Sequence, residues 1–204
     1  MAITSRATLE TAIDNWLART DISASRKEEF ITLFEAVVNR RLHVRQMESS
    51  DDLTTSAGII ALPTDFGSVR TVTYNGSPAV QLAYLTPSLF RSLHPDASAG
   101  TPTTYTIEGS NLKVLPYADD TDAITLRYYA KLDALDADDA TNWLLTAYPD
   151  CYLAGVMHEA QVYSQNAEGA ILWKQKRDEL FEEIIRESNR SMGPLAIRPI
   201  GTVI

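Results

Sequence analysis

The chain has 204 residues and a mass of 22.6 kDa, with 45% apolar and 22% charged residues. These values are typical of folded proteins and exclude a disordered or collagen-like chain. The length suits one sizeable domain or two small ones, each able to bury a core. The single cysteine, Cys151, cannot form an internal disulfide, and three histidines without neighbouring cysteines do not match a standard zinc site.

Negative charge is concentrated in the middle of the chain. The net charge is −9, and residues 51–141 contribute −7, with five basic against twelve acidic side chains. Binding to nucleic acid requires clustered Lys and Arg, so this balance predicts a protein that repels DNA. No apolar run approaches the roughly 18 to 20 residues of a membrane span, and the start of the chain lacks the apolar stretch of a signal peptide. We therefore expect a product made in the cytoplasm, without membrane contact.

Two helices are predicted in the first 45 residues, joined as an αα-hairpin. Thr8 is expected to cap the first helix, and the segment 25–28 has the capping-box pattern that opens the second, which should run to about Arg45. The apolar residues of both helices repeat with helical spacing. In the first helix they are Leu9, Ile13, Trp16 and Leu17, and in the second they are Phe30, Leu33, Phe34, Val37, Val38 and Leu42.

From Ser49 the pattern changes to short β-rich runs separated by Gly, Pro and Asn. The expected strands are 58–62, 69–74, 79–85, 104–107, 112–115 and 123–132. Asn75-Gly76 is a strong hairpin signal between the second and third runs, and Gly109 lies in a second hairpin. Thr86-Pro87 has the pattern of an N-cap followed by proline at the first helical position, which predicts a short helix to Leu93.

Helical periodicity returns at Asn142. Pro149 is placed to begin a helix, in which Cys151, Ala154 and Gly155 form a face of small residues that permits close helix approach. A last helix is expected from about Ala167 to Asn189. Its inward side chains are Trp173, Leu180, Phe181, Ile184 and Ile185.

These patterns together predict an α+β fold. Residues 1–48 and 142–190 are expected to form one helical bundle, residues 49–141 an inserted antiparallel β domain, and residues 191–204 an extended tail. Gly and Pro exclude a helix in the tail, yet its apolar content is unlike that of a disordered segment.

The sequence matches no familiar catalytic or metal-binding pattern. His158-Glu159 would begin a zinc-protease motif, but Val162 occupies the place of the second histidine. Aspartates cluster in two runs that we interpret as solvated loops rather than as a cation site, namely Asp119, Asp120 and Asp122, and Asp133, Asp136, Asp138 and Asp139. Cys151 lies among apolar residues and is expected to be inert. We therefore predict no catalytic residue, no metal and no cofactor.

Two segments are candidate partner interfaces. Arg40, Arg41 and Arg45 form the main basic cluster; they suit the negative end of a helix dipole, and also a contact with carboxylates of another protein. In the tail, the apolar residues Leu195, Ile197, Ile200 and Val203 would become ordered against a partner, in a groove or as a strand added to a sheet edge.

The chain also resembles a known family, the head-to-tail adaptor proteins of tailed bacteriophages, particularly of short-tailed phages. Six segments, in order and spacing, carry the resemblance over about Thr8 to Ser188. They are Ala12-Ile13-Asp14-Asn15-Trp16-Leu17, residues 38–48 (Val38 to Glu48), Leu62-Pro63-Thr64-Asp65-Phe66, Tyr105-Thr106-Ile107-Glu108-Gly109, Leu126-Arg127-Tyr128-Tyr129-Ala130 and Thr141-Asn142-Trp143-Leu144-Leu145.

This resemblance implies a structural protein of the virion, placed between head and tail. It implies a ring of copies, usually twelve, that docks on the portal protein and offers a platform to tail or nozzle proteins, while DNA passes through the lumen without specific binding. It implies no active site and no cofactor. Two alternatives from other classes remain: a cell-wall hydrolase that uses paired carboxylates such as Glu108 and Asp133, and a small cytoplasmic ligand-binding or regulatory domain.

Overall fold

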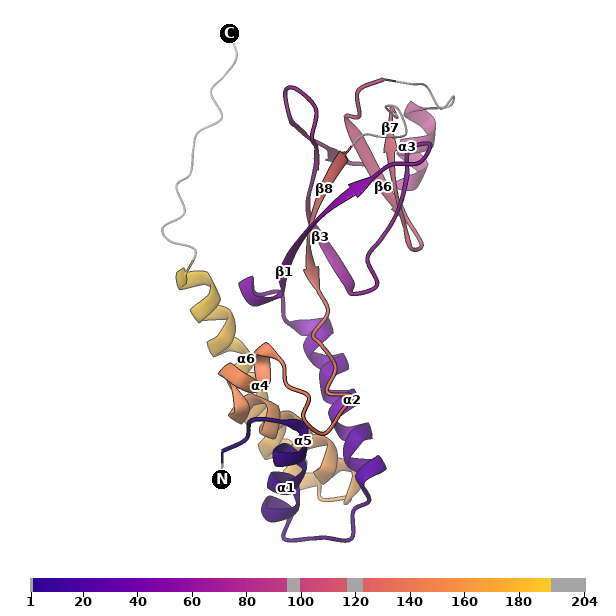
Figure 1. The fold of residues 1–204 in the computed structure, drawn as a ribbon. Helices are drawn as coiled ribbons and strands as arrows, with labels where there is room; N and C mark the ends of the chain where they lie inside the picture. The colour runs from indigo at the N-terminus through magenta and orange to yellow at the C-terminus, as the bar shows by residue number, and fades with distance from the viewer. Residues whose placement is uncertain (1, 95–99, 117–122, 192–204) are drawn as a thin grey trace. The chain divides into compact units, whose positions relative to one another are not determined.

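The computed structural model describes residues 2–94, 100–116 and 123–191 (Figure 1). They form an α+β fold, as the sequence predicted. The chain divides into two compact units: a helical unit, Met1–Gln46 with Leu132–Ile204, and a β unit, Met47–Lys131. The expected β domain extended to residue 141, so residues 132–141 fall in the other unit. The tail predicted at 191–204 lies outside the described residues beyond Ser191.

The helical unit is built from five α-helices in its described part. They are α1 (Arg6–Leu17), α2 (Ala24–Arg41), α4 (Trp143–Ala147), α5 (Pro149–Tyr163) and α6 (Ala167–Ser191). Ser5, not Thr8, is the N-cap of α1, and Thr8 completes the capping box from the third helical position. Ser23 caps α2 by accepting a hydrogen bond from the Arg26 N–H, which places the start before the predicted box.

A close crossing of α2 and α5 forms the centre of this unit. The Phe34 ring is fully buried, with its centroid 5.0 Å from that of Tyr152 and 6.2 Å from that of Phe181. Gly155 lies directly against Phe34, since a Cβ placed on it would be 1.9 Å from Phe34 Cδ2. The small-residue face predicted on α5 is thus what lets α2 approach. Trp16, expected in the core stripe of α1, is instead 59% exposed and contacts the edge of Trp173.

Residues 132–142 belong to the helical unit because polar side chains of the helices bind their backbone. The Leu132 N–H donates to Asn39 Oδ1 at 2.7 Å, and the Leu135 N–H donates to Glu35 Oε1 at 3.0 Å. Arg6 donates from Nη1 to the Leu135 carbonyl at 3.3 Å. A connection without regular structure needs such partners where it is buried. The sequence pattern could not show this, since each pair is separated by at least 93 residues.

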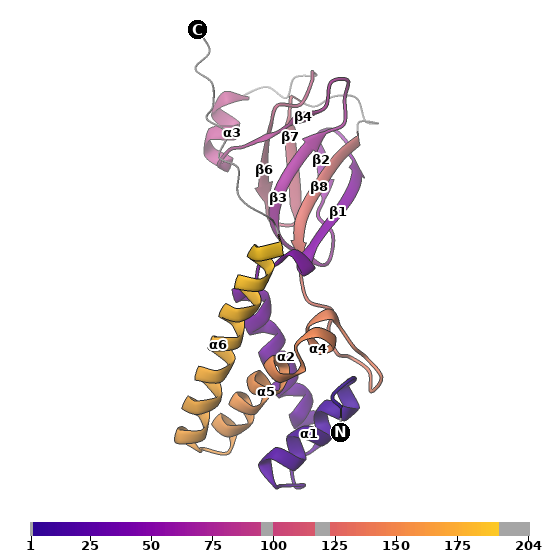
Figure 2. The ribbon, with the colours of Figure 1, turned by 90° about the vertical axis from the view of Figure 1, so that its left-hand side faces the viewer.

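The β unit is a sandwich of two four-stranded sheets (Figure 2). One sheet has the order β1-β8-β3-β4, with β1 Glu48–Thr54, β8 Ala123–Ala130, β3 Phe66–Tyr74 and β4 Val80–Gln81. The other has the order β2-β7-β6-β5, with β2 Ile59–Ala61, β7 Asn111–Leu115, β6 Thr104–Glu108 and β5 Ala83–Tyr84. A short 3-10 turn, η1 (Arg45–Met47), precedes β1, and helix α3 (Pro87–Leu93) follows β5.

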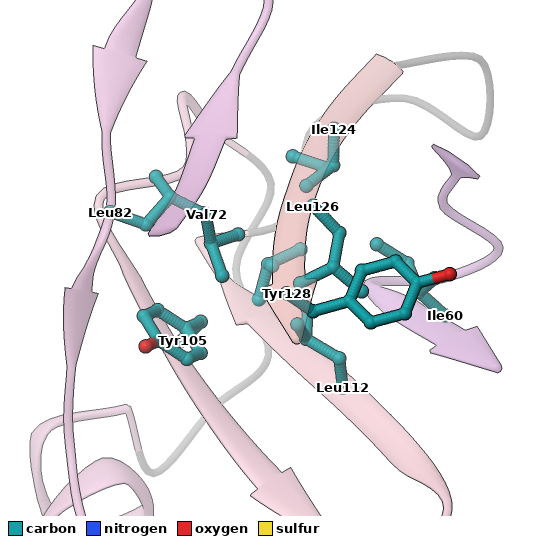
Figure 3. Packing of buried hydrophobic residues seen from close by; sticks show 9 residues of the cluster. Ile60, Val72, Leu82, Tyr105, Leu112, Ile124, Leu126 and Tyr128 are labelled. Carbon is teal, nitrogen blue, oxygen red and sulfur yellow. The ribbon is translucent and has the colours of Figure 1, made fainter. Parts of the chain in front are cut away.

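Alternating side chains of both sheets fill the space between them (Figure 3). The buried cluster consists of Ile60, Val72, Leu82, Tyr105, Leu112, Val114, Ile124, Leu126 and Tyr128. Both predicted hairpins are present, since β3 pairs with β4 and β6 with β7 in antiparallel register. The short helix after Thr86 is also confirmed, with proline at its first position.

Two features of the β unit differ from the prediction. The run 79–85 is not one strand: it divides at the buried Leu82 into β4 and β5, which join different sheets, and β5 pairs with β6 in parallel. Strand β1 was not predicted because its sequence, ESSDDLT, is polar and carries one large apolar residue. It forms because all seven of its residues pair with β8.

Candidate interaction surfaces

The predicted arginine cluster lies where α2 ends, and only two of its members are on that helix. Helix α2 ends at Arg41 rather than near Arg45, because Leu42 adopts an extended conformation (φ −97°, ψ 130°). Leu42 and Val44 are both fully buried, so leaving the helix places both side chains in the core. Arg45 therefore begins the 3-10 turn, and the dipole of α2 does not extend to it.

Arg41 is already engaged within the helical unit. Its guanidinium pairs with Asp178 of α6 and lies 5.3 Å from the centre of the Phe181 ring. Arg177 Nη2 is 3.0 Å from the same carboxylate. Burial acts to raise the pKa of Asp178, but the hydrogen bonds from Arg177 and Arg41 outweigh it, and the pKa is lowered. Arg41 thus links α2 to α6.

Arg40 and Arg45 are different. Both side chains are exposed, and neither forms an ion pair with any residue that the structure describes. The main-chain N–H of Arg45 donates to Ser188 Oγ at 3.0 Å, which fixes the backbone and leaves the guanidinium at the surface. Guanidinium groups that form no ion pair with the described residues are suited to bidentate contacts with carboxylates of another chain. Of the three arginines, Arg41 therefore links α2 to α6, whereas Arg40 and Arg45 present exposed positive charge.

The exposed apolar side chains of the helices were not predicted as a site. Ile171 is 67% and Leu172 65% exposed on α6, and Leu33 is 52% exposed on α2. Ile171 and Leu172 were not among the side chains predicted to face inward on α6. Two large apolar residues outside that stripe were the sequence signal for an exposed apolar site. Leu33 was assigned to the core of its helix and is at the surface instead. Leu33 is the one large apolar side chain among the residues that line the hollow on α2, whereas Ile171 and Leu172 are adjacent in sequence on α6.

The two carboxylates considered for a hydrolase lie in different units, and Glu108 is paired with cations. Glu108 on β6 accepts a 2.7 Å bond from Lys113 Nζ and lies 3.3 Å from Arg91 Nη2. The Lys113 hydrogen bond is the main reason that the pKa of Glu108 is lowered, whereas a general acid needs a raised pKa. Asp133 is exposed and belongs to the helical unit, not the β unit.

Glu35 is the clearest carboxylate with a raised pKa, and its partners are structural. Burial raises the pKa, while hydrogen bonds from Tyr152 and Leu135 act against the increase. Tyr152 Oη lies 2.6 Å from Glu35 Oε1, the same oxygen that accepts the Leu135 N–H. This carboxylate therefore stabilises the connection from the β unit.

The remaining nucleophile and metal candidates have structural surroundings. Cys151 is buried, and burial raises the pKa of its thiol to about 12. His158 Nδ1 is 2.9 Å from the Ala170 carbonyl and links α5 to α6. Among residues 2–94, 100–116 and 123–191, no three His, Cys, Asp or Glu side chains gather as metal ligands. The run Asp119, Asp120 and Asp122 lies outside these ranges. Within them, no helix has the length and apolar content needed to cross a bilayer.

Comparison with known families identifies the chain. The family model described as SU10 adaptor protein matches residues 4–198, and the chain therefore belongs to that family. No curated protein sequence matches it. The family consists of phage head-to-tail adaptors, so the chain is a structural component of a bacteriophage particle.

Proposed function

We propose that this SU10-family adaptor forms a ring that docks on the portal protein and provides the attachment platform for the tail. The observation that carries the proposal is the family match across residues 4–198. The surface supports it: the helical unit presents large exposed apolar side chains, and its exposed Arg40 and Arg45 form no ion pair with the residues that the structure describes. A ring of twelve copies is the stoichiometry we propose.

The proposed ring has a lumen through which DNA passes without specific binding. Residues 51–141 carry twelve acidic and five basic side chains. Like charge raises the free energy of DNA close to a wall of this composition, so the duplex would not adhere. The protein would act as a conduit and not as an enzyme. The lowered pKa of Glu108 and the structural partners of Glu35 support that assignment.

Arg40 and Arg45 form the first proposed contact with a partner, either the portal or a neighbouring copy. The test mixes purified adaptor with portal rings and images the product. The double reversal Arg40→Glu/Arg45→Glu should prevent docking, because both guanidiniums would be replaced by repelling carboxylates. Arg41 is left unchanged because its pairing with Asp178 belongs to the fold.

A matched control separates this contact from a general effect of charge. The control variant Arg19→Glu/Arg91→Glu changes the net charge equally, at two surface arginines that pair with Asp21 and Glu108. It should dock normally. Docking by the Arg40→Glu/Arg45→Glu variant would show that these arginines are not the contact. Failure of the unaltered protein to form any ring with portals would contradict the proposed function itself.

The tail provides the second proposed contact. Leu195, Ile197, Ile200 and Val203 lie in a segment that also contains two Gly and two Pro, at 193, 194, 199 and 201. This composition is suited to an extended segment that binds a partner's groove or sheet edge. The partner would supply the buried area that offsets the entropy of ordering this segment.

A further inference from the structure

The start of helix α1 and the segment 132–141 hold each other in place. The first N–H groups of a helix have no partner within that helix. In α1, the Arg6 N–H donates to the Ala140 carbonyl at 3.1 Å, and the Ala7 N–H donates to the Asp138 carbonyl at 3.0 Å. Each side therefore satisfies main-chain groups that the other leaves without a partner.

Leu135, near the middle of this segment, is bound by two helices. Its carbonyl accepts a bond from Arg6 Nη1 of α1 at 3.3 Å, and its N–H donates to Glu35 Oε1 of α2 at 3.0 Å. All three residues are buried. Burial raises the pKa of Glu35, and the charge of Arg6 is among the groups that act against this increase. Departure of Arg6 would leave Glu35 as a buried charge without its cation, which destabilises the site that holds Leu135.

Helix α1 has few anchors besides these bonds. Of its twelve residues Arg6, Leu9 and Ile13 are buried, whereas α5 buries eight of its fifteen. One ion pair joins it to α2, between Asp14 and Lys27 Nζ at 2.6 Å. An isolated helix of this length is marginal in water. Elements with few buried apolar side chains open at a lower free energy than the core, so α1 should open before α2 and α5 unfold.

We propose that α1 and residues 132–141 form one latch, which opens as a unit while α2, α5 and α6 stay folded. The chain passes between its two units at residues 46–47 and again at residues 131–132. The closed latch fixes the segment that follows the second of these passages. When the latch opens, the freed residues can extend by up to about 3.3 Å each, which lengthens that connection to the β unit. The latch lies within a single chain and does not depend on the proposed ring.

Hydrogen exchange of single main-chain amides, followed by NMR on the full chain, tests the latch. The protection factors of the Ala7 and Leu135 amides should agree within about threefold. Both should lie at least about tenfold below that of the Val156 amide in α5, because a local unit opens more often than the whole domain unfolds. One shared protection factor for all three amides would mean that only global unfolding occurs, and would overturn the proposal.

Two matched substitutions show whether helix and segment open together. Ile13→Val trims a fully buried side chain of α1 and should accelerate exchange at Ala7 and Leu135 by the same factor, about 2- to 12-fold. Ile184→Val trims an equally buried side chain of α6. It should leave Ala7 and Leu135 unchanged, because α6 stays folded when the latch opens, and should accelerate exchange at Val156. Both substitutions are mild enough to preserve the fold.

Three results would overturn the shared opening. In the Ile13→Val variant, faster exchange at Ala7 with no change at Leu135 would show that α1 opens alone. Acceleration of these two amides by Ile184→Val as large as that by Ile13→Val would show that they follow global unfolding. Coupling between two sites is also reciprocal. Leu135→Val should therefore accelerate exchange at Ala7 as much as at position 135, and an unchanged Ala7 amide would contradict the latch.

Discussion

Replacement of Gly155 by alanine tests the closest contact in the helical core. The added Cβ would lie 1.9, 2.1 and 2.6 Å from three ring atoms of Phe34, far inside van der Waals distance. Phe34 cannot move aside easily, because Tyr152 and Phe181 pack on it and no part of it is exposed. Overpacking of this kind costs about 1 to 3 kcal/mol. The three short contacts place this site at the upper end of that range, about 3 kcal/mol. Alanine regains about 1 kcal/mol of helix propensity, so we expect Gly155→Ala to lower the free energy of unfolding by about 2 kcal/mol.

Tryptophan fluorescence during denaturant unfolding measures this change in the helical unit specifically. The chain has three tryptophans, Trp16, Trp143 and Trp173, and all lie in that unit. Gly169→Ala is the matched control, since its Cβ would meet only the side-chain ends of Asn166 and Gln161. These ends are held by hydrogen bonds, from Asn166 Nδ2 to Gln161 Oε1 and from the Gly169 N–H to Asn166 Oδ1, and not by a packed ring. The control should therefore lose less stability than Gly155→Ala.

A double-mutant cycle identifies the cause of the expected loss. Phe34→Leu alone removes buried volume and should destabilise the protein, but in the Gly155→Ala background it also relieves the clash. The double variant should therefore lose less stability than the sum of the losses measured for Gly155→Ala and Phe34→Leu separately. Equal stability of Gly155→Ala and Gly169→Ala, or strict additivity with Phe34→Leu, would refute the packing argument.

Three further changes test other parts of the structure. Because burial raises the pKa of Glu35, its folded-state pKa exceeds the unfolded one, and stability should fall as pH rises from about 4.5 through the folded pKa. Glu35→Gln keeps an oxygen acceptor but cannot ionise, so its free energy of unfolding should not show this decrease with pH. If the two proteins differed in free energy of unfolding by the same amount at every pH from 4 to 8, the raised pKa of Glu35 would be contradicted. Arg41→Ala should lower the free energy of unfolding by about 1 kcal/mol through loss of the Asp178 pair. Arg40→Ala should leave it unchanged within about 0.5 kcal/mol. Equal losses for the two variants in denaturant unfolding would show that Arg41 does not stabilise the contact between α2 and α6. Truncation after Arg190 should leave melting unchanged and abolish retention on portal rings in a pull-down, and normal retention would show that the tail is dispensable.

Local signals in the sequence were sufficient for most of the fold. Helical spacing, the Asn75-Gly76 turn and Thr86-Pro87 each act within a few residues, and the corresponding elements are present. Strand β1 depends instead on its pairing with β8, 69 to 81 residues later in the chain, and its own composition carries little signal. Propensity is a weak guide for an edge strand whose formation is decided by its partner.

The candidate surfaces also combine features that local sequence signals predict with features that depend on residues far apart in the chain. The arginines were found because they are adjacent in sequence, but the partner that separates Arg41 from Arg40 is Asp178, 137 residues later. Exposure of Trp16 depends on how α1 meets α6, which periodicity within one helix does not specify. Ile171 and Leu172 were visible in the sequence only as apolar residues outside the core stripe of their helix.

The division of charges between interior and surface connects this fold to an assembly role. Inside the helical unit, Arg6 and Glu35 hold the backbone of residues 132–142. A buried charge that loses its partner is strongly destabilising, so these groups cannot be exchanged for recognition of another molecule. The proposed contacts therefore use charges without such duties, such as Arg40 and Arg45, which form no ion pair with the described residues. A protein whose buried Arg6 and Glu35 are committed to its own connections can still vary its surface, and the adaptor role that we propose, between a portal and a tail, needs that freedom.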